Sequence, residues 1–299
     1  MTTFLPTLRQ LQYLVALNDH GHFGRAAESC FITQSTLSAS LRELETLLGS
    51  TLVERSRRVT RFTPLGLRIV SKARLVLRAA EELAEMAEAE REPLTGELRM
   101  AVIPTIAPFL LPPLLPRLRA EHPSLKLFLR EEPSGAACDG LHRGVVDCAL
   151  LAMPFACGDI DHDVLFEDGL LVASAPGEVT GTEVRPEQIS ASRLLLLEDG
   201  HCLKDHALAA CDRATLRPDA TVLGTSLHTL VQMVDNRIGM TLLPQMAIDG
   251  GILGGTRVQT RPLRSANAHR DIALIWRFSS PRAGDFRLLA DALAAGARG

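Results

Sequence analysis

The segment GRAAESCFITQSTLSASLRELETLLG, residues 24–49, decides how the N-terminal part of this 299-residue chain folds. Its first half carries the small residues Ala26 and Ala27, followed by Cys30–Phe31, and predicts a short helix. A brief turn at Ile32–Thr33 separates this helix from a longer helical pattern. Two short helices with small residues where they cross are typical of a helix-turn-helix, whose second helix enters the major groove of DNA.

The second helix is expected to run from Gln34 to Leu48, because leucines recur through it at helical spacing. Thr33 is the expected N-cap and Gly49 the expected C-terminal stop. The N-terminal residues of such a helix face base edges, where glutamine pairs with adenine and hydroxyls bind bases or phosphates. The candidate DNA-contacting residues of this helix are Gln34, Ser35, Thr36, Ser38 and Arg42.

The segment TLVERSRRVTRFTP, residues 51–64, predicts a two-stranded wing with Arg55, Arg57 and Arg58 near its tip. Phosphate contacts from such arginines position a protein on DNA and make its affinity depend on salt. Residues 1–78 contain 11 Lys and Arg against 5 Asp and Glu, whereas the rest of the chain contains 21 against 30. This asymmetry favours a DNA-binding domain over the alternative, a helical protein-interaction module.

A long helix is expected to begin at Thr63–Pro64 and to end before Pro93 and Gly96. Its apolar residues are spaced alternately four and three positions apart, which is the pattern of a short coiled-coil seam. The pattern indicates a dimerisation helix, and a single amphipathic helix packed on its own domain is the alternative. The seam residues are Ile69, Ala73, Val76, Ala80, Leu83 and Ala87.

The remainder of the chain alternates short apolar strands with helical stretches, which predicts an α/β domain with a largely parallel sheet. Ligands of open α/β sheets bind beyond the carboxyl ends of strands. Thr105 and Ser134 follow two such strands, although either residue can simply cap the next helix. The chain shows no Gly-rich phosphate loop, metal-spaced His/Cys cluster or nucleophile elbow, which argues against a conventional enzyme; we expect neither a cofactor nor a metal site. The predicted strands are LRMAVI (98–103), LKLFLRE (125–131), VDCALLA (146–152) and VLFEDGLLVASA (164–175).

Composition limits the class of protein further. A hydrophobic content of 46% and a net charge of −3 are typical of a globular protein rather than a disordered one. The N-terminus MTTFLPTLRQLQYL has no signal-peptide pattern, and no stretch approaches 18 uninterrupted apolar residues. We therefore expect a cytoplasmic protein without membrane contact, in which the six cysteines are reduced thiols.

Two cysteines lie nine positions apart in LEDGHCLKDHALAACDR, residues 197–213. Leu194–Leu197 predicts a buried strand, and Asp199 or Gly200 is the expected cap of a helix over His201–Ala210. The first cysteine of the pair then falls in the first turn of the helix, where the helix dipole favours negative charge.

Cys202 is this first cysteine, and His201 and Lys204 can add positive charge beside it, which favours the thiolate. An unbroken helix would place Cys211 roughly 13–14 Å away, whereas a disulfide needs Cα atoms about 4.4–6.8 Å apart. A bond between the two cysteines would therefore require the helix to unfold. The alternative is that both cysteines are ordinary small core residues.

Residues 8–92 resemble the winged helix-turn-helix and linker helix of LysR-type transcriptional regulators, on the motif GRAAESCFITQSTLSASLRELETLLGSTLVERSRRVTRFTPLG. Ser35 departs from the family pattern, where many members have proline; proline is merely favoured at such early helix positions. The resemblance implies an effector domain of two α/β lobes, similar to a periplasmic binding protein. The chain would cross to the second lobe near Phe166 and return near His269.

The resemblance divides the chain into three parts. They are a winged helix-turn-helix domain (1–62), a linker and dimerisation helix (63–92) and a two-lobed regulatory domain (93–299), in which lobe I covers about 93–166 and 270–299 and lobe II about 167–269.

Over nearly the whole chain the resemblance is to the peroxide-sensing members of the family. It implies that Cys202 is the peroxidatic and Cys211 the resolving cysteine. His201 and Thr105 would hold the peroxide, and Arg270 would stabilise the thiolate or polarise the peroxide. Further candidates are Ser134, where the subfamily has threonine, and Thr225–Ser226, which would line the cleft. The matching segments are VIPTIAPFLLP, LLLLEDGHCLKDHALAAC, TSLHTLVQMV, GMTLLP and HRDIALIWR.

The expected function is thus a nucleoid-associated transcription activator that senses hydrogen peroxide and controls antioxidant genes. Its expected partners are double-stranded DNA, hydrogen peroxide, RNA polymerase, a cellular thiol reductant and further copies of itself, as a tetramer built from two dimers. One alternative is a LysR-type regulator of a small metabolite bound between the lobes. Another is a thiol peroxidase, which would leave the basic N-terminal domain unexplained.

The other four cysteines receive no role from the sequence. Cys30 and Cys148 are expected to be packed, and Cys138 and Cys157 to lie near loops where oxidation would be adventitious.

Overall fold

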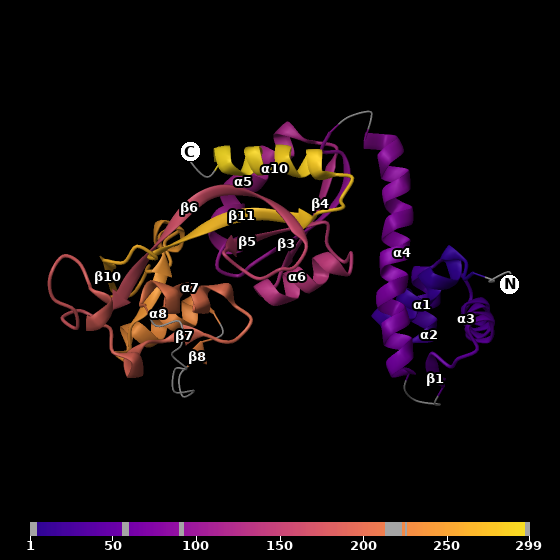
Figure 1. Cartoon of the computed structure of the whole chain (residues 1–299), viewed down its shortest axis with the longest axis horizontal. Coiled ribbons are helices and arrows are strands. Elements are labelled where there is room, and N and C mark those ends of the chain that lie inside the picture. The colour runs from indigo at the N-terminus through magenta and orange to yellow at the C-terminus, as the bar shows by residue number, and fades with distance from the viewer. Residues whose placement is uncertain (1–4, 56–59, 90–92, 213–222, 225, 297–299) are drawn as a thin grey trace. The chain divides into compact units, whose positions relative to one another are not determined.

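The computed structural model describes residues 5–55, 60–89, 93–212, 223–224 and 226–296 (Figure 1). The chain divides into two compact units, one of residues 1–91 with 143–145 and one of residues 92–142 with 146–299. Three residues singled out in the sequence, Arg57, Arg58 and Thr225, lie outside the described residues.

The N-terminal unit is a helix-turn-helix with a wing. Helix α3 has the predicted bounds: Thr33 Oγ1 accepts a hydrogen bond from Thr36 N at 3.2 Å, and Gly49 ends the helix with a φ of 63°. Helix α2 is shorter than predicted, because Cys30 is its C-cap and Phe31 has a left-handed φ of 55°. The elements are α1 (Leu8–His20), α2 (Phe23–Ser29), α3 (Gln34–Leu48), β1 (Val53–Arg55), β2 (Thr60–Phe62) and α4 (Pro64–Ala89).

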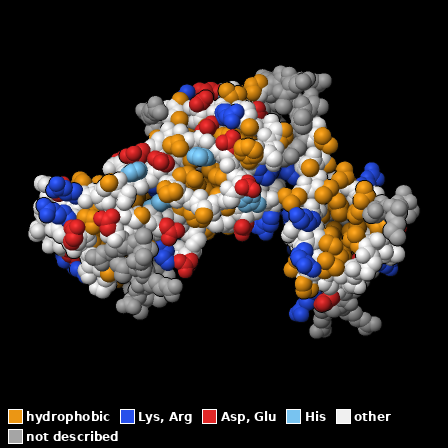
Figure 2. Space-filling view, viewed as in Figure 1, with side chains coloured by type: hydrophobic (Ala, Val, Ile, Leu, Met, Phe, Trp, Pro, Cys, Tyr) orange, Lys and Arg blue, Asp and Glu red, His pale blue; other side chains and the backbone are white. Residues whose placement is uncertain are grey.

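The apolar seam of α4 has two parts with different surroundings. Ile69 and Ala73 pack on the core of the N-terminal unit or are buried within that unit. Val76 and Leu83, in the second half of the helix, are 48% and 71% exposed. Hydrophobic side chains are visible on the surface of this unit in Figure 2. The first half of the seam therefore serves its own domain, and the second half leaves apolar surface uncovered in the single chain.

The C-terminal unit is built on a seven-stranded sheet in the order β10-β6-β11-β5-β3-β4, with β9 also paired to β6. The prediction of a largely parallel sheet was wrong: in this sheet β3 is parallel to β4 and β5, whereas the other pairs are antiparallel. The reason is that β6 and β11 run along each other in opposite directions (Figure 1). The strands are β3 (Gly96–Val102), β4 (Leu125–Glu131), β5 (Cys148–Met153), β6 (Ile160–Ser174), β9 (Thr241–Pro244), β10 (Gln259–Pro262) and β11 (His269–Arg277).

Two hydrophobic cores lie in this unit, and we call them the lobe I core and the lobe II core. Leu165 of β6 belongs to the lobe I core and Leu170, five residues on, to the lobe II core, so the chain passes between the lobes within one strand. Helices α5 and α10 lie on one face of the lobe I strands and α6 on the other (Figure 1). The helices here are α5 (Ala107–Glu121), α6 (Ser134–His142) and α10 (Ala283–Gly296).

Lobe II contains the C-terminal part of β6 together with β9 and β10. It also contains a separate parallel pair of strands, β7 and β8. Its helices surround the lobe II core, and α7 also contacts β5 and β11. No helix among the described residues is both long and apolar enough to cross a membrane. The elements are β7 (Leu196–Leu197), α7 (Cys202–Ala210), β8 (Leu223–Gly224), α8 (Leu227–Asp235), α9 (Gln245–Asp249) and two short 3-10 turns, Pro186–Gln188 and Ala191–Arg193.

Candidate functional site

Cys202 is the first residue of α7, as the sequence predicted. The cap differs from the prediction: His201 is the N-cap and makes no side-chain cap bond, while Gly200 forms the preceding turn with a φ of 96°. Cys202 is 1% exposed, and its backbone N–H donates to Ser134 Oγ at 3.3 Å. The helix N-terminus is thus held against the start of α6 by one of the predicted site residues.

Arg270 is fully buried and is held by Asp168, Thr105 and Met246, whose Sδ accepts from Nη2 at 3.4 Å. Its Nε donates to Asp168 Oδ2 at 3.0 Å, and its Nη1 and Nη2 donate to Thr105 Oγ1 and the Thr105 carbonyl at 2.7 and 3.0 Å. Asp168 Oδ1 in turn accepts from Met246 N at 3.0 Å. A guanidinium fixed by a forked set of bonds keeps a permanent positive charge in place within a low-dielectric interior.

Asp168 is a site residue that the sequence analysis missed. It lies directly opposite Arg270 across the antiparallel β6–β11 pair, and it is 3% exposed. The signal was present, since an acid followed by glycine interrupts the apolar run of β6. This signal could not be interpreted from the sequence, because it is the antiparallel register that places Arg270 beside Asp168.

Burial lowers the pKa of both histidines on this segment, His201 and His206, so each is a neutral imidazole near pH 7. Lys204 forms an ion pair with Asp199 and lowers the pKa of that carboxyl. Near pH 7 His201 therefore adds no positive charge beside Cys202, and the charge of Lys204 is balanced by Asp199.

His206 is a second residue that the sequence analysis did not select. Its Nε2 donates to the Pro154 carbonyl at 3.1 Å, and its buried Nδ1 has no hydrogen-bond partner among the described residues. The charge of Arg270 acts with burial to lower the pKa of His206. The site thus has its predicted residues in two bonded pairs, Ser134 with Cys202 and Thr105 with Arg270, with His206 electrostatically coupled to Arg270.

Cys211 is at the other end of α7, as its C-cap, with its N–H bonded to the Ala207 carbonyl at 3.1 Å. It is 1% exposed and belongs to the lobe II core, whereas Cys202 belongs to the lobe I core. The two cysteines are not joined by a disulfide in this structure. The intact helix α7 separates the two cysteines, and each is packed in a different hydrophobic core.

The remaining cysteines differ in part from expectation. Cys138 lies within α6 rather than near a loop, and it forms a disulfide with Cys157, with a Cα–Cα separation of 5.4 Å. Both partners are buried, so the expectation of six reduced thiols was wrong for this pair. Cys148 is buried in the lobe I core as predicted, and Cys30 is half-buried.

The predicted DNA-contacting side chains of α3 are presented on its surface. Gln34, Ser35, Thr36 and Arg42 are exposed and Ser38 is half-buried. The Thr33 hydroxyl lies 2.9 Å from Ser35 Oγ and 2.8 Å from Thr36 Oγ1, so it orders the first turn of the recognition helix. Arg55 ends strand β1 of the wing.

Comparison with known proteins places both parts of the chain in one family. Residues 8–67 match the bacterial regulatory helix-turn-helix protein, lysR family, and residues 91–298 match the LysR substrate binding domain. The chain belongs to the LysR family of transcriptional regulators. The LysR architecture accounts for a helix-turn-helix that binds DNA and for a two-lobed domain that regulates it.

Several relatives of this LysR protein align along nearly its full length. It is 40% identical to the transcriptional regulator EstR of Acinetobacter baylyi over 97% of this chain and 96% of EstR. It is 39% identical to a hydrogen peroxide-inducible genes activator of Dickeya chrysanthemi, over 96% and 94%. A cysteine-to-aspartate variant of full-length OxyR from Pseudomonas aeruginosa is similar in structure, with a TM-score of 0.79, 33% identity, and coverage of 97% and 95%.

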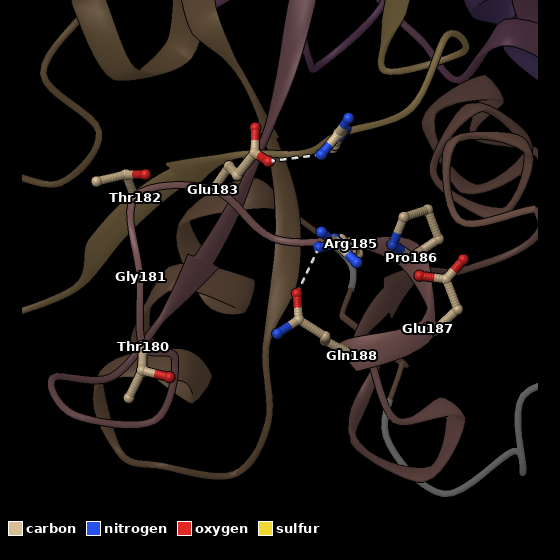
Figure 3. Close-up of a pocket in the computed structure, with 9 residues that line it drawn as sticks. Thr180, Gly181, Thr182, Glu183, Arg185, Pro186, Glu187 and Gln188 are labelled. Atoms are coloured by element: carbon tan, nitrogen blue, oxygen red, sulfur yellow. Dashed lines mark hydrogen bonds and ion pairs between the residues drawn. The ribbon is translucent and has the colours of Figure 1, made fainter.

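Other polar positions of this LysR domain have different structural roles. Ser226 caps α8 by accepting from Thr229 N at 3.2 Å, which is the ordinary structural role of such a residue. A polar surface hollow is lined by the loop 180–188 and Arg264, where Glu183 and Arg264 form an ion pair (Figure 3). None of the predicted site residues lines this hollow.

Proposed function

We propose that this LysR-type regulator senses hydrogen peroxide through Cys202 and Cys211 and controls antioxidant genes. The position of Cys202 carries the proposal: it is a buried thiol at a helix N-terminus, and its backbone is held by a buried hydroxyl. A helix N-terminus stabilises a thiolate, which is the form that attacks peroxide. The name of the Dickeya relative, a hydrogen peroxide-inducible genes activator, points to the same stimulus.

In the proposed reaction the Cys202 thiolate attacks one peroxide oxygen, the O–O bond breaks, and the hydroxide that leaves is protonated to water. Cys202 becomes a sulfenic acid. The Cys211 thiol then attacks the Cys202 sulfur, a disulfide forms, and a second water leaves. Two thiols and one peroxide thus give one disulfide and two waters.

Buried donors and acceptors near Cys202 give the peroxide its binding groups in this proposal. Thr105 and Ser134 supply hydroxyls, and neutral His201 supplies an imidazole beside the thiol. Arg270 supplies the fixed positive charge that stabilises charge developing on the leaving oxygen. Asp168 acts through Arg270 as a positioning residue, because it orients the guanidinium.

The second step changes the structure of lobe II. An intact α7 keeps its ends roughly 13–14 Å apart, and a disulfide needs about 4.4–6.8 Å. Cys211 or Cys202 must therefore leave its core as α7 unwinds. This refolding is the event that we propose alters packing between subunits and hence the contacts with DNA.

The proposal includes an oligomer with the exposed half of the α4 seam, Val76 and Leu83, in its interface. A dimer presents two recognition helices to successive half-sites of DNA. We further propose a tetramer of two dimers that acts with RNA polymerase at promoters, in the bacterial cytoplasm at the nucleoid, and that is reset by a cellular thiol reductant.

Regulation by a small metabolite is the second candidate, because the relative EstR carries no mention of peroxide in its name. The deciding experiment exposes the full-length protein to stoichiometric peroxide for seconds, followed by alkylation, trypsin and mass spectrometry. Trypsin cleaves after Lys204 and separates the two cysteines, so a link between peptides 194–204 and 205–213 reports the disulfide. Two alkylated thiols would reject peroxide sensing and support the metabolite.

A further inference from the structure

The Cys138–Cys157 disulfide joins two segments that both touch α7. Cys138 lies one turn into α6, and Cys157 lies in the segment that follows β5. The same two segments are joined again by His142, whose Nε2 donates to the Cys157 carbonyl. These two links fasten α6 to the 154–158 segment at neighbouring points.

Each fastened segment holds a different part of α7. From α6, Ser134 Oγ accepts from Cys202 N at 3.3 Å, and Gly135 N donates to the Gly200 carbonyl at 3.4 Å. From the 154–158 segment, the Pro154 carbonyl accepts from His206 Nε2 at 3.1 Å. The start of α7 and its fifth residue, His206, are therefore each held by an element that the disulfide connects.

A disulfide in a DNA-binding regulator needs an explanation, because the compartment that holds bacterial DNA keeps thiols reduced. Disulfides found there are usually transient or regulatory rather than structural. Cys138 and Cys157 are 6% and 5% exposed, so neither residue is completely enclosed.

We propose that Cys138–Cys157 is a second, reversible redox bond that sets how Cys202 reacts with peroxide. This inference rests on the peroxide-sensing function proposed above. The bond forms by exchange with a small disulfide such as oxidised glutathione: the Cys138 and Cys157 thiols lose two protons and two electrons, and the small disulfide becomes two thiols. A dithiol reverses the exchange.

The two steps at Cys202 respond in opposite directions. With the bond formed, Ser134 and the first turn of α7 are fixed, so attack on peroxide is fast and unwinding of α7 is slow. With the bond broken, attack slows by about tenfold, short of the 100-fold that a 1 Å misplacement of reacting groups can cause. Unwinding, and with it closure of Cys202 onto Cys211, becomes several-fold faster. The bond thus sets how long the sulfenic acid persists.

The first test is a redox titration of the full-length Cys202→Ser protein in glutathione buffers, read by alkylation and mass spectrometry. Trypsin gives Cys138 in peptide 131–143 and Cys157 in peptide 144–193, because it does not cleave between Arg185 and Pro186, and fragmentation separates Cys157 from Cys148 in the latter peptide. The expected result is a reversible transition between linked and unlinked peptides. Peptides that stay unlinked throughout, or that stay linked in native excess dithiothreitol, would each overturn the proposal.

The second test compares stopped-flow rates of sulfenic acid formation and disulfide closure in Cys157→Ala and in the parent protein. Cys148→Ala is the matched control, because it removes a buried sulfur from the same lobe I core and leaves the bond intact. The expected result is slower attack and faster closure in Cys157→Ala alone, with melting temperatures recorded for both variants. Equal rates in all three proteins would overturn the inference, whereas a lack of any Cys202–Cys211 link in the parent would overturn the proposed function itself.

Discussion

Cys202 and Cys211 lie at opposite ends of one helix, α7, and both are about 1% exposed, yet their surroundings differ. Cys202 belongs to the lobe I core, and its backbone N–H donates to the buried hydroxyl of Ser134. Cys211 packs among aliphatic side chains of the lobe II core. Burial alone therefore does not distinguish a reactive cysteine from a resolving one. The backbone N–H of Cys202 is bonded to a buried hydroxyl and that of Cys211 to a carbonyl of its own helix, and the predictions below test that difference.

The largest expected effect is that of Cys202→Ser, which removes the nucleophile from the polar end of α7. We expect no peroxide-induced disulfide and no peroxide-dependent change in a DNA footprint, while DNA binding itself persists. Cys30→Ser is the control, because Cys30 is half-buried in the DNA-binding unit, away in sequence from α7. A footprint that still responds to peroxide in Cys202→Ser would show that Cys202 is not the cysteine that reacts with peroxide.

Asp168→Asn tests the charge that supports the polar end. This substitution leaves the buried charge of Arg270 without its counter-charge. Loss of one partner of a buried ion pair usually lowers the free energy of unfolding by about 3–5 kcal/mol. Urea unfolding measures this loss.

Thr105→Val is a milder substitution at the same group, since it removes one acceptor of Arg270 while keeping the side-chain volume. We expect about tenfold slower oxidation of Cys202 in Thr105→Val, a loss in the usual range for one buried hydrogen bond. An unchanged rate would exclude the Thr105–Arg270 pair from the reaction.

Cys211→Ser tests the apolar end. Because the first step does not use Cys211, we expect the sulfenic acid on Cys202 to form at the parent rate and then to persist, detectable with a sulfenate-specific label. Mass spectrometry should find no link between peptides 194–204 and 205–213. If a label-reactive sulfenic acid failed to accumulate, another thiol would have to resolve Cys202.

Ala209→Gly weakens α7 between the two cysteines at a half-buried position. Glycine lowers helix stability by about 1 kcal/mol relative to alanine, so unwinding, and with it disulfide closure, should be up to about fivefold faster. Sulfenic acid formation should keep its rate, because the first turn is unchanged. Stopped-flow measurement of both steps checks this, and an equal closure rate would show that unwinding does not limit the second step.

The smallest expected effect concerns pH. Burial holds the pKa of His206 below its ordinary value of 6.5, so between the two values the unfolded chain binds a proton that the folded protein does not. Stability should therefore decrease as the pH falls below about 6.5, by at most about 1.4 kcal/mol per pH unit for one such group. Urea unfolding at pH 7.5 and 5.5 measures this decrease, and His206→Gln should reduce it. An equal decrease in His206→Gln would assign the effect to other groups.

The sequence predicts local structure here better than it predicts partners. Thr33 and Gly49 fix the ends of α3 by capping, and capping depends on neighbouring residues only. Strand β4 likewise has its predicted bounds, Leu125–Glu131. The antiparallel register that pairs Asp168 with Arg270 joins residues 102 positions apart, and no local pattern contains it.

The same limit explains the missed disulfide. Cys138 and Cys157 meet because α6 packs against β5 and the following segment returns beside it, which depends on how the layers assemble. The placement of Cys202 in the first turn of a helix was accessible from sequence, since glycine and a polar residue precede it. The residues that are buried in the same core as Cys202 could be identified only from the folded domain.

The buried Arg270 has a consequence for motion between the lobes. It binds Asp168 on β6 and Thr105 after β3, and Asp168 also holds the N-terminus of α9, a helix of the lobe II layer. Separating these buried charges in a medium of low dielectric constant is expensive, so a motion that keeps them together is favoured over one that parts them. These bonds join β6, β11, the segment after β3 and α9, whereas the refolding proposed above involves one nine-residue helix, α7. The proposed signal is thus an order–disorder transition of one segment, and we expect its speed to be that of local unfolding rather than of domain rotation.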